Sequence, residues 1–116
     1  VDYVTDPKTR TISQGLTTEG FRNEDDPLWK FERWIRIDEY IKYPKVLYNL
    51  FGEYSVINCE FIDGNLIEVH FRANEDMGEY DEIIPVWKGE EINAPNDFTY
   101  IEQPDYKRVG FYKRKK

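Results

Sequence analysis

The chain has 116 residues, of which 34% are charged and 16% aromatic, and its formal net charge is −7. This length predicts a single domain over residues 1–116, and the acidic balance argues against a nucleic-acid partner. The sequence has neither an apolar run long enough to span a bilayer nor a visible signal peptide, which argues against a membrane partner. The single cysteine, Cys59, cannot form an intramolecular disulfide, so we expect a reducing, cytoplasmic location.

In chain order, the sequence patterns predict an α+β fold, mostly an antiparallel sheet with one short helix packed on it. The strands expected before the helix cover residues 1–5, 9–13 and 29–37. Residues 15–28 are polar and glycine-containing, and we expect them to form a loop. The helix is expected at Pro44–Phe51, because Pro44 suits the first turn of a helix and Gly52 suits its end.

After the helix, the segment from Ile57 to Arg72 predicts two alternating strands joined by a tight turn. One face of this hairpin is apolar, and the other face carries Asn58, Glu60, Glu68, His70 and Arg72. A three-residue loop, Asp63–Asn65, with Asn65 in the left-handed conformation, keeps the two faces separate. In that register Glu60 lies opposite Glu68 and Asn58 lies opposite His70.

The rest of the chain predicts an acidic loop at 74–82 and three short strands. These strands cover residues 83–87, 98–102 and 106–112. Pro85 predicts that the first of them is an edge strand or ends there. Residues 107–116 carry no acidic group and six basic ones, Lys107, Arg108, Lys113, Arg114, Lys115 and Lys116. We expect a basic terminal strand that ends in a solvated tail.

The opposed carboxylates of Glu60 and Glu68 need compensation, because like charges directly opposite on a sheet are destabilising. Two interpretations follow from the residues alone. In the first, a divalent cation bridges the two carboxylates, with His70 as a third ligand. In the second, the two glutamates belong to a solvated sheet face, where water screens their repulsion.

The sequence Glu60-Phe-Ile, a short turn and Ile67-Glu68-Val-His70-Phe-Arg72 resemble the metal-binding hairpin of the ATP-grasp superfamily. In that family, two acids and an Asn on two antiparallel strands hold magnesium between the ATP phosphates, and an Arg meets the acyl substrate. The resemblance implies that Glu60, Glu68 and His70 are metal ligands and that Arg72 is catalytic. His70 stands where the family has Asn, and an imidazole suits manganese or zinc better than magnesium.

The resemblance covers roughly residues 1–75 and implies an ATP-dependent carboxylate ligase that forms an acyl-phosphate intermediate. The implied cofactors are ATP and Mg²⁺ or Mn²⁺, and the implied substrate is a small carboxylate. Asn74 is expected near the substrate, and the phosphate contacts are expected from Arg22, Arg33 and Arg36. This chain would then be the C-terminal lobe of a catalytic domain, inactive without an N-terminal lobe that precedes Val1.

Another interpretation belongs to a different functional class. The chain would be a non-catalytic, acidic and aromatic-rich protein-interaction domain, in which Glu60 and Glu68 are ordinary surface acids. In the ligase interpretation, the missing lobe leaves a sheet edge open, and this edge could pair with a second copy to give a homodimer. Metal binding by the glutamate pair separates the two interpretations.

Overall fold

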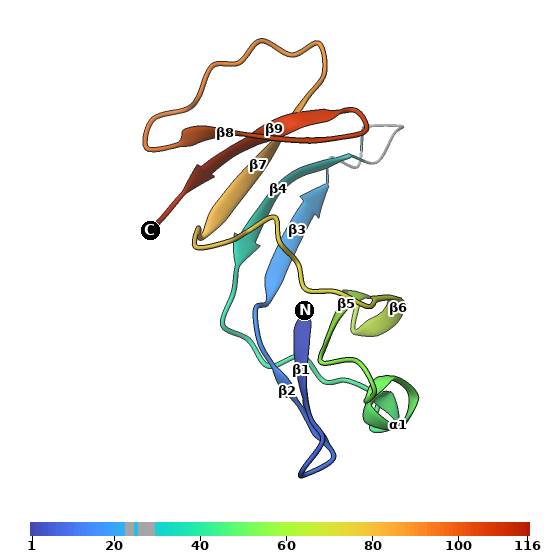
Figure 1. The fold of residues 1–116 in the computed structure, drawn as a ribbon. Helices are drawn as coiled ribbons and strands as arrows, with labels where there is room; N and C mark the ends of the chain where they lie inside the picture. The colour runs from blue at the N-terminus through green and yellow to red at the C-terminus, as the bar shows by residue number, and fades with distance from the viewer. Residues whose placement is uncertain (23–24, 26–29) are drawn as a thin grey trace. The chain divides into compact units, whose positions relative to one another are not determined.

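The structure is a computed structural model that describes residues 1–22, 25 and 30–116. These residues form two compact units, each built around its own antiparallel sheet (Figure 1). The first unit combines Val1–Thr17 with Ile37–Asp76, and the second combines Thr18–Arg36 with Met77–Lys116. The predicted α+β class, with mostly antiparallel strands and a short helix, is confirmed. Within the described part of the chain, no helix has the length and apolar character needed to cross a bilayer.

The sheet of the first unit contains the two hairpins that the sequence predicts, in the strand order β2-β1-β5-β6. The strands are β1 (Asp2–Asp6), β2 (Thr11–Gln14), β5 (Val56–Ile62) and β6 (Asn65–His70). Strands β1 and β5 pair antiparallel and so join the N-terminal hairpin to the polar hairpin. One face of this sheet is buried, with Tyr3, Ile57 and Cys59 fully inaccessible to solvent.

The helix α1 (Leu47–Phe51) packs on that buried face through Leu47, which lies in the same core cluster as Tyr3 and Ile57. It starts later than the predicted Pro44. The N–H of Leu47 donates to the carbonyl of Pro44 over 3.0 Å, so residues 44–46 form a tight turn that leads into the helix. The helix therefore contributes one fully buried side chain, Leu47, while its Tyr48 and Phe51 pack against the same core and remain partly buried.

The turn between β5 and β6 differs from the predicted three-residue loop. Asp63 and Gly64 both have positive φ, 51° and 79°, which is the pattern of a two-residue type I′ turn. Asn65 belongs to β6 and pairs with Ile62. A β-bulge then leaves Ile67 without a partner, and from there the register is as predicted, with Glu60 opposite Glu68 and Asn58 opposite His70. A two-residue turn alone would place Glu60 opposite Ile67, and the unpaired Ile67 shifts the register by one residue so that Glu60 lies opposite Glu68.

The second unit contains a five-stranded sheet in the order β3-β4-β7-β9-β8. Its strands are β3 (Thr18–Arg22), β4 (Phe31–Arg36), β7 (Glu82–Trp87), β8 (Thr99–Asp105) and β9 (Arg108–Arg114). Most of the predicted strand 29–37 is present as β4, while Trp29 lies outside the described residues. The predicted basic terminal strand is β9, which extends to Arg114.

Strand β3 lies where the sequence predicts a loop. Its central Gly20 has no side chain, and a Cβ there would lie 2.6 Å from the rings of both Phe31 and Trp34. These two rings are in contact, with centroids 4.2 Å apart and planes tilted by 32°. The strand is thus held by aromatic side chains of its neighbour β4, a contact that no alternation within residues 15–28 could indicate.

The prediction that Pro85 marks a strand edge or end is wrong, because β7 pairs with both β4 and β9 and continues to Trp87. The reason is the shortness of the β4–β7 ladder, which involves only Glu82 and Ile83. Pro85 lies beyond that ladder, so its missing N–H costs no hydrogen bond to β4. The last turn is also displaced, because Pro104 and Asp105 belong to β8 and the positive φ is at Tyr106.

The type I′ turn makes Gly64 a test of the hairpin geometry. Replacing Gly64 with Ala should lower the free energy of unfolding by about 1 kcal/mol, because Ala is strained at positive φ. A Cβ at this position meets no atom within 4 Å, so the loss reflects backbone strain alone. Urea denaturation measures it. Asp63→Asn is the control, since Asn tolerates the left-handed conformation, and an equal loss in both variants would contradict the assigned turn.

The buried thiol of Cys59 and the buried phenol of Tyr3 predict how the free energy of unfolding depends on pH in the alkaline range. Burial raises the pKa of the Cys59 thiol above its ordinary value of 9.0 and that of the Tyr3 phenol above 10.0. The folded state keeps these protons where the unfolded chain releases them. Their contribution to stability is therefore complete below pH 9.0 and is lost as the pH rises further.

Tyr3→Phe should make this alkaline loss of stability shallower, because it removes one of the two groups. The measurement is the free energy of unfolding by urea at several pH values between about 8 and 11, a range that brackets the ordinary pKa values of Cys and Tyr. Tyr106→Phe is the matched control, since Tyr106 is almost fully exposed and should leave the profile unchanged. Parallel profiles for the native chain and Tyr3→Phe would refute the prediction.

Candidate metal centre

Three potential metal ligands meet on the open face of the first unit's sheet. Glu60 on β5 lies directly opposite Glu68 on β6, and His70 follows two residues later on the same face. The Nε2 atom of His70 lies 3.5 Å from Oε1 of Glu60 and 3.7 Å from Oε1 of Glu68. One ligand atom from each residue lies within 4.8 Å of the other two. The structure thus brings together the three residues that the sequence predicts as ligands.

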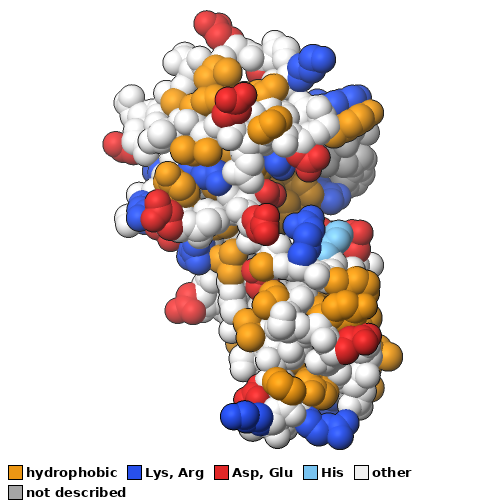
Figure 2. Space-filling view, viewed as in Figure 1, with side chains coloured by type: hydrophobic (Ala, Val, Ile, Leu, Met, Phe, Trp, Pro, Cys, Tyr) orange, Lys and Arg blue, Asp and Glu red, His pale blue; other side chains and the backbone are white. Residues whose placement is uncertain are grey.

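The alternation of the strands explains why these side chains point the same way. Ile57 and Cys59 of β5 are buried against α1, so the residues between and beyond them, Asn58 and Glu60, must face the opposite side. The side chains of Glu60, Glu68 and His70 are 45%, 55% and 31% exposed. Figure 2 shows the imidazole, the only histidine of the chain, reaching the surface. The group is therefore accessible to a ligand from solvent.

The donor set fits a divalent cation. Zinc lies about 2.0–2.2 Å from its nitrogen and oxygen ligands, so two ligand atoms on one such ion are at most about 4.4 Å apart. Both distances from the imidazole meet that limit, and the oxygen atoms of the two glutamates lie within 4.8 Å of each other. Two carboxylates and an imidazole suit manganese or zinc. The same cation would cancel the repulsion between the opposed carboxylates.

A third carboxylate on this face, that of Asp2 on β1, was not expected from the sequence. Asp2 is 7% exposed and accepts a hydrogen bond of 2.8 Å from Nδ2 of Asn58. It also accepts from the backbone N–H of Asn74 over 3.0 and 3.2 Å to its two oxygens. Asp2 therefore ties β5 to the segment that follows β6.

The two residues predicted on the acyl side both follow β6. Arg72 is exposed and its Nη1 lies 3.4 Å from the carbonyl of Ala73. Asn74 is partly buried, and its Oδ1 accepts a hydrogen bond of 2.9 Å from the backbone N–H of Asp76. Both residues belong to the unit that contains the glutamate pair.

The three arginines predicted to contact phosphate belong to the second unit, where each contacts protein groups. The guanidinium of Arg22 lies over the ring of Phe31, 4.3 Å from its centroid. Arg33 forms an ion pair of 3.3 Å with Glu82, and Arg36 donates to the carbonyls of Gly78 and Tyr80. Glu82 is buried and also contacts Arg114 over 2.6 Å. This pair of arginines around one buried carboxylate stabilises the sheet.

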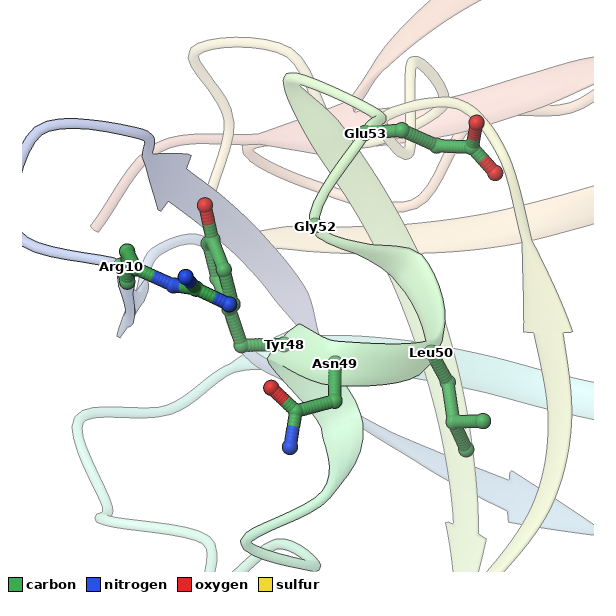
Figure 3. A pocket seen from close by; sticks show the side chains of 6 residues that line it. All are labelled: Arg10, Tyr48, Asn49, Leu50, Gly52 and Glu53. Carbon is green, nitrogen blue, oxygen red and sulfur yellow. The ribbon is translucent and has the colours of Figure 1, made fainter.

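A hollow of the first unit lies beside α1. It is lined by Arg10, Tyr48, Asn49, Leu50, Gly52 and Glu53. Figure 3 shows the guanidinium of Arg10 beside the ring of Tyr48, whereas the carboxylate of Glu53 points away from them. The polar groups do not converge on one point, so this hollow has no constellation for catalysis or metal binding.

Comparison of the chain with protein-family models, with curated proteins and with solved structures finds no match. The resemblance to the ATP-grasp superfamily therefore depends on the hairpin residues themselves. What the structure adds is the geometry of Glu60, Glu68 and His70.

Proposed function

We propose that Glu60, Glu68 and His70 bind a divalent cation and that this chain is the metal- and ATP-binding half of an ATP-dependent carboxylate ligase. The observation that carries the proposal is the direct opposition of the two glutamates, with the imidazole within 3.7 Å of both. A solvated sheet face gains nothing from like charges in this position. A cation site needs them there.

When bound, the cation would neutralise charge on the ATP phosphates, which is much of what phosphoryl transfer requires. The two glutamates and His70 orient it from one sheet face. We assign Arg72, which is exposed two residues beyond the end of β6, to the carboxylate substrate or to the phosphoryl group that this substrate attacks. Because Oδ1 of Asn74 is already bonded to Asp76, its Nδ2 is the atom we assign to the carboxylate substrate.

Of the three arginines predicted to contact phosphate, Arg33 and Arg36 already hold a carboxylate and backbone carbonyls, and Arg22 lies over the ring of Phe31, so we assign no phosphate contact to them. The adenine pocket belongs, in this proposal, to an N-terminal lobe. The proposal also keeps the cytoplasmic location, where ATP and small carboxylates are available, and a homodimer through an open sheet edge.

A second candidate function, a protein-interaction domain, is favoured by the aromatic surface beside the same hairpin. Phe71 is exposed and stacks on Tyr54 with ring centroids 4.3 Å apart. Phe51 lies 5.7 Å from Phe71, and Leu50 is exposed. Exposed aromatic and aliphatic side chains that gather in this way mark interaction sites. In this case the chain would bind a partner without needing a metal.

Titration with Mn²⁺ tests the metal site directly. The native chain should bind Mn²⁺, and Glu68→Gln should weaken the affinity at least about tenfold, since loss of a direct ligand should cost at least as much as loss of a residue that merely supports one. Electron paramagnetic resonance of free Mn²⁺ measures the affinity. Adding ATP should raise the melting temperature further than Mn²⁺ alone if phosphates share the ion.

Glu53→Gln is the matched control, because it removes the same charge from an exposed glutamate of the first unit that is not part of the ligand group. It should bind Mn²⁺ as the native chain does. In the presence of EDTA, Glu68→Gln should be no less stable than the native chain, since it relieves the repulsion with Glu60. Equal Mn²⁺ affinity in all three proteins, or none in the native chain, would eliminate the proposed site.

The imidazole predicts a metal preference that a single substitution should change. His70→Asn replaces a nitrogen ligand with an amide oxygen, which should weaken Zn²⁺ binding about tenfold or more while Mg²⁺ binding is kept or improved. Competition of each metal against Mn²⁺ measures this change. A variant whose Zn²⁺ and Mg²⁺ affinities fall together would show that His70 supports the fold of the hairpin and is not a ligand.

A further inference from the structure

Asn58 completes a rectangle of polar side chains with the three proposed ligands. It lies two residues before Glu60 on β5, on the same face, and directly opposite His70 on β6. On its other side it lies opposite Asp2 of β1. Side chains directly opposite each other on antiparallel strands have Cβ atoms about 4.5–5.5 Å apart. Asn58 is therefore a neighbour of His70 on the face where the cation would bind.

The buried carboxylate of Asp2 determines how the amide of Asn58 is turned. An ionised carboxylate can only accept hydrogen bonds, so Asn58 must present Nδ2 to it, as the 2.8 Å contact records. The amide nitrogen is thus committed to the β1 side, and Oδ1 is directed away from Asp2. The two flipped orientations of an asparagine amide have nearly the same shape, but only the one that presents Nδ2 can donate a hydrogen bond to the carboxylate.

Asp2 is itself held in place, so the orientation of Asn58 is not easily lost. Both of its oxygens accept from the backbone N–H of Asn74, over 3.0 and 3.2 Å. With 7% of its surface exposed, it has little access to water. A buried carboxylate costs free energy of desolvation, and its hydrogen bonds to Asn58 and Asn74 offset that cost while fixing the Asn58 amide.

From these contacts we infer that Oδ1 of Asn58 is a fourth ligand of the cation and that Asp2 is the residue that positions it. This inference rests on the proposed metal site. The ligand set would then contain three oxygen donors and one nitrogen, which favours manganese over zinc. Removing a residue that hydrogen-bonds to a metal ligand, as Asp2 does to Asn58, commonly lowers metal affinity 10- to 100-fold.

Two substitutions test the inference, each measured by Mn²⁺ affinity and by urea denaturation in EDTA. Asn58→Ala removes the ligand and should weaken Mn²⁺ binding about tenfold or more. Asp2→Asn keeps the shape of Asp2. In the native chain, Oδ1 of Asp2 accepts from both Nδ2 of Asn58 and the N–H of Asn74, and Oδ2 accepts from Asn74 as well. The substitution replaces one of these acceptors with a donor and removes the negative charge, so the amide of Asn58 is held less firmly. Asp2→Asn should weaken Mn²⁺ binding to a similar extent. Asn49→Ala, at an exposed asparagine on α1, should have no effect.

The outcomes distinguish the role of Asn58 from the proposed metal site of Glu60, Glu68 and His70. If Glu68→Gln abolishes Mn²⁺ binding while folded Asn58→Ala and Asp2→Asn bind as the native chain does, the metal site stands and the role of Asn58 is refuted. If Asn58→Ala is too unstable to test, Asp2→Asn alone decides, with native affinity counting against the inference. If the native chain binds no Mn²⁺, both the site and its fourth ligand are refuted.

Discussion

The burial of Tyr3, Ile57 and Cys59 beneath α1 is the constraint on which the rest of the first unit depends. In a strand, successive side chains point to opposite faces, so fixing Ile57 and Cys59 inward fixes Asn58 and Glu60 outward. A slip of one residue would expose the apolar row and bury Glu60, at a cost of several kcal/mol. The opposition of Glu60 and Glu68 is thus maintained by the core on the other face, against its own electrostatic repulsion.

The bulge at Ile67 reconciles two local preferences that a regular hairpin could not satisfy together. Asp63-Gly64 favours a two-residue type I′ turn, whose twist matches that of the flanking strands. The apolar core favours Glu60 opposite Glu68, which such a turn would offset by one residue. Leaving Ile67 unpaired satisfies both. Bulges of this kind re-aim side chains, and they are common near functional sites.

The local signals of the sequence predicted the fold class, both hairpins of the first unit and the position of Glu60, Glu68 and His70 on one face, because alternation and turn residues act over a few positions. The sequence could not indicate β3, whose Gly20 is covered by rings from another strand. Nor could it indicate that Glu82 would be buried between Arg33 and Arg114. Asp2 was missed for the same reason, since its role depends on β1 pairing with β5 across a long segment of chain. Such contacts form only when distant segments meet.

The exposure of the ligands bears on what kind of metal site this would be. A structural metal site closes its coordination shell with protein ligands, whereas a catalytic one leaves positions for water or substrate. Here both carboxylates lie about half exposed on a sheet face. Magnesium and manganese prefer oxygen ligands, and magnesium in particular keeps several positions for water and for substrate phosphates.

An ion held by Glu60, Glu68, His70 and Asn58 from one side would have its remaining positions directed outward. In the proposed function, phosphate oxygens of ATP would complete them, and an open site of this form would suit the positioning of a substrate better than the stabilisation of the fold.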